Sequence, residues 1–165
     1  MPDDAELALL TERVVERLAE RSLILSIAES CTGGWVSKLI TDIVGSSAVL
    51  DRGFVTYSNQ AKQDMLGVPP ETLKAFGAVS EETARAMVLG ALEHSNADEA
   101  LAITGIAGPG GGTDSKPVGT VFIAWGGQLA DPQVERLEFK GDREAVRRQA
   151  VKSALQGLMH RMELQ

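Results

Sequence analysis

Hydrophobic and polar positions follow two different periods along this chain and predict both helices and strands. Leu7, Leu10, Val14 and Leu18 recur at steps of three and four residues, as on the buried face of an amphipathic helix. Short apolar runs bounded by turn residues predict strands at 23–28, 48–57, 99–106, 118–125 and 134–139. Further helices are predicted at 35–41, 60–66, 70–77 and 81–94, and a last one runs from its cap at position 142 to about 162.

The order of these elements predicts the fold class. Strands and helices that alternate along a chain are typical of an α/β fold, here a three-layer α/β/α sandwich on a mixed, largely parallel five-stranded sheet. Only the last two strands are close enough in sequence to form a hairpin, through Gly126-Gly127-Gln128 and neighbouring residues. The 165 residues contain no linker or internal repeat, so we expect one domain over 1–165 with one proper core.

Composition and charge narrow the function classes. The net charge of −7 disfavours sequence-independent binding of nucleic acid, which needs a basic surface. The apolar runs are too short to span a membrane, and the acidic start of the chain lacks the basic region of a signal peptide. The single cysteine fits a reducing compartment, so we expect a cytoplasmic protein. His94, His160 and Cys31 show no metal-ligand spacing, and we expect neither a metal nor another cofactor.

Polar side chains gather where three of the predicted strands end. The turns at 29–32, 56–59 and 104–105 carry hydroxyls, a thiol, an amide and a glycine N–H group. Ligands of open α/β sheets bind outside the carboxyl ends of the strands. If the three strands run parallel, these turns share one rim, and that rim is the predicted site.

Residues 27–34 (IAESCTGG) are the most informative of these turns, because an apolar strand meets a helix start there. The N–H groups of a helix start favour negative charge, which suits either a nucleophile or a bound anion. In the simplest interpretation this stretch is a connecting turn with Thr32 as the N-cap. Ser30 and Cys31 are alternative nucleophiles: a thiolate at a helix start is reactive, whereas a buried thiol only fills apolar space.

A base for a serine nucleophile has to be something other than histidine, because neither histidine is suitably placed. A lysine can take this role if burial keeps its amine neutral. Lys62 lies one helical turn after Tyr57-Ser58-Asn59 and could lean back toward the rim, since helical side chains point toward the N-terminus. The alternative is that Lys62 lies on a solvated helix face, as most lysines do.

Two further features could serve a ligand. Residues 105–112 are rich in glycine but lack the Lys-Ser/Thr pair of a phosphate-binding P-loop, so they form either a mobile loop over a site or a surface connection. In the last helix, Arg143 and Arg147 fall on the same stripe as Ala150 and Leu158. Arginines near a core face usually need an acidic partner, which could be a protein carboxylate or a phosphate of the substrate.

Several motifs together resemble the CinA C-terminal domain family. They are 28–34 (AESCTGG), 53–62 (GFVTYSNQAK), 77–80 (GAVS), 103–109 (ITGIAGP) and 116–121 (KPVGTV), in this order and over almost the whole chain. The resemblance implies that nicotinamide mononucleotide and water give nicotinate mononucleotide and ammonia, a step that recycles pyridine nucleotides, with no metal. It also implies a catalytic serine helped by lysine and tyrosine, which match Ser30, Lys62 and Tyr57.

The resemblance and the chemistry above give each site residue an expected role. Ser30 would attack the carboxamide while Lys62 takes its proton, directly or through Tyr57, and the N–H of Cys31 or Gly105 would stabilise the oxyanion. The 5′-phosphate would bind the two arginines or the Gly33-Gly34 helix start. The predicted substrate-binding residues are Cys31, Thr32, Gly33, Gly34, Asn59, Thr104, Gly105, Arg143 and Arg147.

Two other functions stay open at this stage. The rim could bind a nucleotide without turning it over, or the protein could act through a protein partner in competence or DNA-damage responses, as the family name suggests. For the amidase we expect a small-molecule nucleotide as the ligand, no nucleic acid, no membrane, and a homodimer.

Overall fold

The computed structural model describes residues 1–165 and contains one five-stranded sheet. The strands are β1 Leu25–Glu29, β2 Leu50–Val55, β3 Glu99–Gly105, β4 Thr120–Gly127 and β5 Ala130–Glu138, in the spatial order β2-β1-β3-β4-β5. β1 pairs in parallel with β2 and β3, while β4 is antiparallel to both of its neighbours. Only β4 therefore runs against the others, which confirms the predicted mixed, largely parallel sheet.

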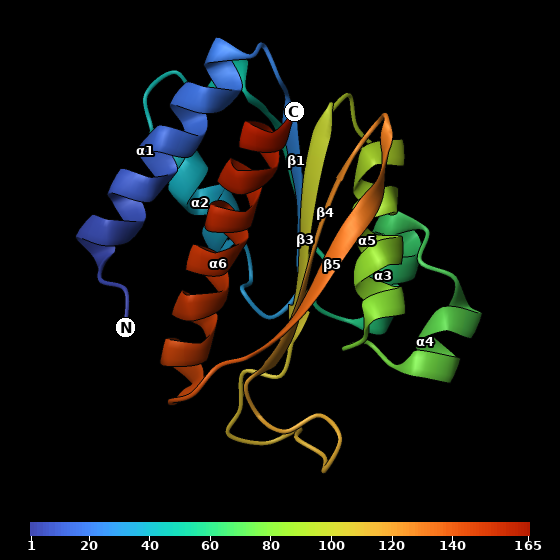
Figure 1. Ribbon diagram of the computed structural model, residues 1–165. Helices are drawn as coiled ribbons and strands as arrows, with labels where there is room; N and C mark the ends of the chain where they lie inside the picture. The colour runs from blue at the N-terminus through green and yellow to red at the C-terminus, as the bar shows by residue number, and fades with distance from the viewer.

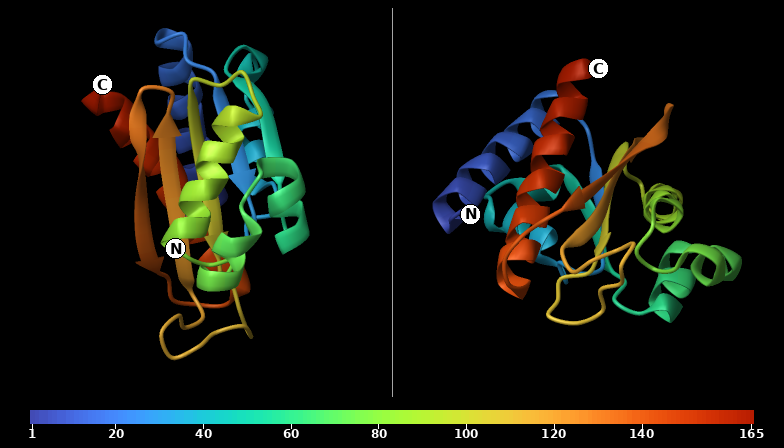
Figure 2. Two further views of the ribbon diagram at one scale, coloured as in Figure 1. Left: turned by 90° about the vertical axis from the view of Figure 1, so that its right-hand side faces the viewer. Right: turned by 60° about the horizontal axis from the view of Figure 1, so that its bottom comes forward.

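Helices cover both faces of the sheet, as Figures 1 and 2 show. One face carries α1 Asp4–Glu20, α2 Trp35–Asp42 and α6 Arg143–Leu164, and the other carries α3 Asn59–Leu66, α4 Pro70–Phe76 and α5 Glu81–Glu93. Each face has its own apolar cluster, of 25 buried residues on the side of α6 and 14 on the side of α5. The predicted three-layer sandwich is therefore confirmed, with two half-cores separated by the sheet.

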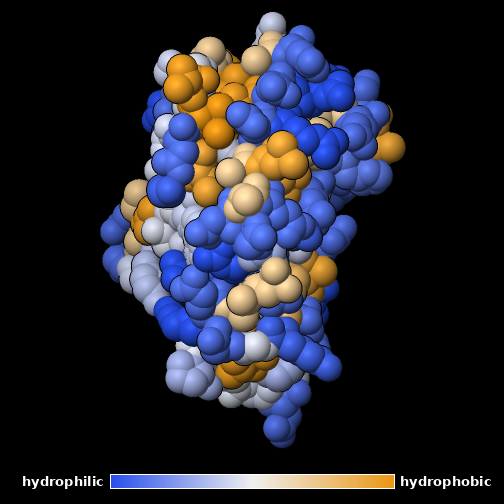
Figure 3. All heavy atoms as spheres, turned by 90° about the vertical axis from the view of Figure 1, so that its left-hand side faces the viewer, coloured by the Kyte–Doolittle hydropathy of each residue, from blue (hydrophilic) through white to orange (hydrophobic).

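The side of the molecule that α1 covers is mainly hydrophilic, with separate apolar patches (Figure 3). No helix combines the length and the hydrophobicity that crossing a membrane requires. Side-chain caps lie where the pattern predicted them, since Asp142 accepts from the Ala145 N–H at 2.9 Å and Ser80 from the Thr83 N–H at 3.1 Å.

Most strand boundaries differ from the prediction by one or two residues, and two of the differences have a clear local cause. β2 begins at Leu50 because Ser46–Ala48 form a 3-10 turn after Gly45, whose φ is 89°. β5 begins at Ala130, four residues early, because Gly127 and Ala130 pair across a tight hairpin. Pro132 is tolerated in this strand because β5 lies at the sheet edge, where a missing N–H costs no ladder bond.

The sheet brings the three predicted turns to one edge. Because β2, β1 and β3 are parallel neighbours, their carboxyl ends lie side by side, and the register pairs Glu29 with both Val55 and Ile103. The long 106–119 connection between β3 and β4 extends from this same edge (Figure 1, bottom). The fold thus places residues 30, 56–57 and 104–105 next to each other.

Candidate active site

Residues 30–33, which we call the 30–33 turn, connect β1 to α2. The Ser30 N–H donates to the Ile103 carbonyl at 3.0 Å, and the Gly33 N–H donates to the Ser30 carbonyl at 3.1 Å. The N-cap of α2 is Gly34, in the left-handed region with a φ of 97°, rather than the predicted Thr32. Thr32 instead donates its hydroxyl to Glu29 at 2.7 Å, because its side chain points into the core.

Glu29 has a structural role that the sequence did not reveal. Its buried carboxylate accepts from the Thr32 hydroxyl, from the N–H groups of Val36 and Ser37 at 2.9 and 3.0 Å, and from the Ser37 hydroxyl at 2.8 Å. The start of α2 thus already holds an anion, which is the protein's own. The free helix start expected at this turn for a ligand or for a thiolate is therefore occupied.

Lys62 is buried and contacts Ser30. Its side chain is 1% exposed, and Nζ lies 3.0 Å from Ser30 Oγ and 2.8 Å from the Thr56 carbonyl, to which it donates. No carboxylate lies within ion-pair distance of this amine. Burial lowers the pKa of Lys62 from its ordinary value near 10.5. Lys62 therefore lies inside the cavity edge beside Ser30 and not on a solvated helix face, and a neutral amine in this place is able to accept a hydroxyl proton.

Cys31 is a buried thiol with low reactivity. Burial raises its pKa to about 12, so the thiolate needed for attack is scarce near neutral pH. The expected lowering of this pKa by a helix start is wrong, because α2 begins only at Trp35 and Glu29 accepts from its N–H groups. A Cβ at Gly105 would come within 2.7 Å of Val121 Cγ2 and 3.2 Å of Cys31 Sγ, so this position has no room for a side chain.

A cavity of about 170 Å³ opens at this edge of the sheet. Thr104 donates its hydroxyl to the Ala78 carbonyl at 2.7 Å in its wall, so its oxygen keeps acceptor capacity toward a ligand. Asn59, Thr32, Gly33, Gly34 and Arg147 do not line it. The lining residues are Ser30, Cys31, Tyr57, Lys62, Ala78, Val79, Thr104, Gly105, Ala107 and Arg143.

The mouth of this cavity is bridged by Arg143. Its Nη2 donates to the Tyr57 hydroxyl at 2.9 Å and its Nη1 donates to the Gly108 carbonyl at 2.8 Å. The Tyr57 side chain is 62% exposed and makes no hydrogen bond with Ser30 or Lys62. Direct proton transfer between Ser30 and Lys62 therefore has better geometry than transfer through Tyr57.

Arg147 lies one turn further along α6 and contacts the protein backbone. Its Nε donates to the Cys31 carbonyl at 3.0 Å, and its Nη2 donates to the Thr32 carbonyl at 3.1 Å. Its guanidinium also lies over the Trp35 ring, 5.4 Å from the centroid. Neither Arg143 nor Arg147 pairs with a carboxylate; both contact neutral oxygen atoms of the site instead.

Comparison with known proteins places the chain in a family. Residues 7–162 match the CinA C-terminal domain, and the chain therefore belongs to this family. The nicotinamide-nucleotide amidohydrolase PncC of Escherichia coli K12 is 54% identical over 155 residues, which are 94% of either chain. A CinA-like protein of Akkermansia muciniphila is 49% identical over 92% of this chain but only 37% of its own length.

Solved structures show the same fold. The competence/damage inducible protein CihA from Agrobacterium tumefaciens superposes with a TM-score of 0.92 and 46% identity, covering 97% of this chain and 96% of its own. A CinA superfamily protein from Klebsiella pneumoniae 700603 has a TM-score of 0.92 and 40% identity, over 96% of this chain and 99% of its own. The α/β architecture is therefore that of the family.

Proposed function

We propose that this protein hydrolyses the carboxamide of nicotinamide mononucleotide, giving nicotinate mononucleotide and ammonia. The observation that carries the proposal is the 3.0 Å contact between Ser30 Oγ and the buried amine of Lys62. Support also comes from the identity of 54% and 53% to two proteins named nicotinamide-nucleotide amidohydrolase PncC. A hydroxyl beside a neutral amine is an activated nucleophile, and a carboxamide carbon is a suitable target.

In the first half of the reaction Ser30 Oγ bonds to the carboxamide carbon as Lys62 accepts its proton. The oxyanion then needs N–H donors, and the Cys31 N–H is free because no acceptor in the chain binds it. One such donor is worth about 3 kcal/mol in the transition state. The Lys62 ammonium returns its proton to the departing nitrogen, the C–N bond breaks, and ammonia leaves an acyl-enzyme on Ser30.

In the second half water attacks the acyl-enzyme. Lys62, again neutral, takes a proton from the water, the new oxyanion uses the same N–H donor, and the proton finally goes to Ser30 Oγ. Nicotinate mononucleotide is then released. The balance is one water consumed for one ammonia formed, with no electron transfer.

The cavity size suggests how the nucleotide binds. About 170 Å³ is less than the ~300 Å³ or more of sites that enclose a whole ligand, so the cavity takes the carboxamide ring. Thr104 would orient the carboxamide from the wall, and Asn59 would meet the ribose at the rim. The phosphate would remain at the mouth, where Arg143 would exchange its bond to the Tyr57 hydroxyl for a charge-assisted one.

The test is the release of ammonia from nicotinamide mononucleotide by purified protein. Ser30→Ala should abolish turnover, whereas Cys31→Ala should retain it because the thiol stays protonated. If Cys31→Ala lost the activity and Ser30→Ala retained it, the nucleophile would be the Cys31 thiol and not the Ser30 hydroxyl. Calorimetric binding of the nucleotide without ammonia release would identify a binding protein instead.

A homodimer and a cytoplasmic location are further parts of this proposal. The location rests on the single cysteine, which fits a reducing compartment. Sedimentation equilibrium of the purified protein measures the oligomeric state, and a mass of 17.5 kDa at micromolar concentration would contradict the dimer.

A further inference from the structure

The 30–33 turn is held from two sides by buried or stacked charged groups. On one side the Glu29 carboxylate binds the Thr32 hydroxyl and the start of α2. On the other side Arg147 donates to two successive carbonyls of the turn, those of Cys31 and Thr32. Backbone carbonyls are ordinary acceptors, and a charged donor strengthens each of these bonds. The turn that carries Ser30 is thus fixed by side chains from outside it.

Arg147 is itself fixed in place. It lies in the second turn of α6, a helix whose start is capped by Asp142 and whose Val146, Ala150 and Val151 are buried. The guanidinium is further held by the Trp35 ring, whose centroid lies 5.4 Å from it. A side chain held by its helix, by an aromatic ring and by two acceptors is suited to hold other atoms in position.

The direction of the Cys31 N–H is set by the carbonyls on either side of it, those of Ser30 and Cys31. The Ser30 carbonyl, in the same peptide plane as that N–H, is held by the Gly33 N–H, and the Cys31 carbonyl is held by Arg147. The N–H of the residue that follows a nucleophilic serine is the donor used by oxyanion holes built on strand-to-helix turns. The Cys31 N–H is in this place and has no acceptor in the chain.

We propose that Arg147 is a positioning residue, which holds the 30–33 turn so that the Cys31 N–H meets the oxyanion, and that it does not bind the phosphate. The inference rests on the proposed amidase function. It gives the two arginines of α6 different tasks, since Arg143 bridges the cavity mouth and Arg147 contacts only the turn and Trp35. Two of the three guanidinium nitrogens of Arg147 are engaged in this way.

Arg148 offers a matched control. It lies over the same Trp35 ring, 5.0 Å from the centroid, but pairs with Asp4 and Glu144 and makes no contact with the turn. Arg147→Gln should therefore lower kcat about 100-fold, as the loss of one oxyanion donor does. Its KM for nicotinamide mononucleotide should stay within about twofold, because uniform binding is unchanged. Arg148→Gln should leave both constants unchanged.

A second readout does not require the nucleotide. A fluorophosphonate reagent modifies an activated serine with loss of fluoride, and mass spectrometry follows the rate at Ser30. This rate should fall in Arg147→Gln in parallel with kcat. Arg147→Lys, which keeps the charge but cannot bridge two carbonyls, should lose about tenfold in both readouts and covers the case in which the glutamine variant does not fold.

The outcomes separate the alternatives. A raised KM with unchanged kcat and unchanged labelling in Arg147→Gln would overturn the inference and make Arg147 a phosphate ligand. Full activity of Arg147→Lys would overturn it as well. A wild-type protein that releases no ammonia, but whose Ser30 labelling still depends on Arg147, would reject the amidase while supporting the positioning role. Labelling absent from the wild type would reject both.

Discussion

Two cations are buried at opposite ends of the central strands, and their surroundings differ. Arg161, 7% exposed, lies near the start of β3 and donates from Nε to the buried Glu99 carboxylate at 2.7 Å. Lys62, 1% exposed, lies near the end of β1 and contacts only a hydroxyl and a carbonyl. Arginine cannot lose its proton, so it needs a counter-charge, whereas a lysine amine can become neutral. The absence of a carboxylate beside Lys62 lets its amine become neutral, which the proposed role as a base requires.

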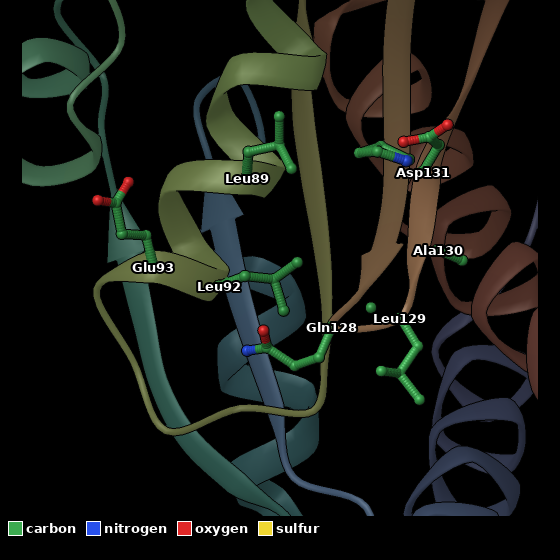
Figure 4. A pocket seen from close by; sticks show the side chains of 9 residues that line it. Leu89, Leu92, Glu93, Gln128, Leu129, Ala130 and Asp131 are labelled. Carbon is green, nitrogen blue, oxygen red and sulfur yellow. The ribbon is translucent and has the colours of Figure 1, made fainter.

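The cavities at the two ends of the sheet also differ in the chemistry of their lining residues. A hollow of about 700 Å³ lies between α5 and the β4–β5 hairpin, where Leu92 of α5 lies beside Gln128 (Figure 4). It holds the carboxylates of Glu93 and Asp131 but no nucleophile and no lysine. The Ser30 cavity is about four times smaller, yet it contains the reactive pair. The chemistry of the lining, and not the volume, identifies the site.

The largest expected effect on activity follows from replacing Lys62, the buried amine without a carboxylate partner. Lys62→Met should lower kcat by about 10³-fold or more, since the general base is lost. The variant should remain folded, because a methionine fills similar space without an amine to desolvate. Ammonia release and thermal denaturation measure the two properties. Activity within tenfold of the wild type would show that another group takes the Ser30 proton.

Replacing Arg161, the buried cation that pairs with Glu99, should lower stability and leave the activity unchanged. Arg161→Met leaves the buried Glu99 carboxylate without its partner and should lower the free energy of unfolding by about 3 kcal/mol. The folded enzyme should keep its kcat, because the pair lies at the far end of β3. Urea denaturation gives the loss, and the added substitution Glu99→Gln should recover part of it. An equal loss in the single and double variants would argue against the pair as the cause.

Because the pKa of Lys62 is lowered, its effects on activity and on stability should both increase with pH, whereas a lysine paired with a carboxylate stabilises the fold less as the pH rises. Only the neutral amine is active, so kcat/KM should rise with pH and level off at a pH below 10.5. Between the folded and unfolded pKa values the unfolded chain binds more protons, so this group's contribution to stability rises with pH. The stability advantage of Lys62→Met over the wild type should therefore shrink as the pH rises toward 10.5. A constant advantage would contradict the shift.

The smallest effect is expected at the large hollow. Leu129 at the tip of the hairpin is fully exposed, so Leu129→Ser should change the free energy of unfolding by less than ~0.5 kcal/mol. Its kcat and KM should equal those of the wild type. A tenfold change in either constant would indicate that the hollow takes part in the reaction and would remove the contrast between the two ends.

Much of the architecture was predictable because its causes are local. Periodicity of apolar positions predicted the helices and strands, and caps such as Ser80 and Asp142 followed from the residues beside them. The convergence of Ser30, Tyr57, Lys62 and Thr104 also followed, since parallel strands end at one edge. The exceptions were positions where an edge strand or a 3-10 turn changed a boundary.

Residue patterns were therefore enough to predict the family, the layered fold and the edge of the sheet where polar turns meet. Which side chains are buried at that edge, and what they contact, follows from the packing of the whole chain. The pKa of Cys31 and the carbonyl partners of Arg147 depend on elements far apart in the chain. Burial and counter-charge are sums over such long-range contacts, and no local pattern contains them. The lowered pKa of Lys62 likewise comes from the burial that the folded chain imposes on its amine.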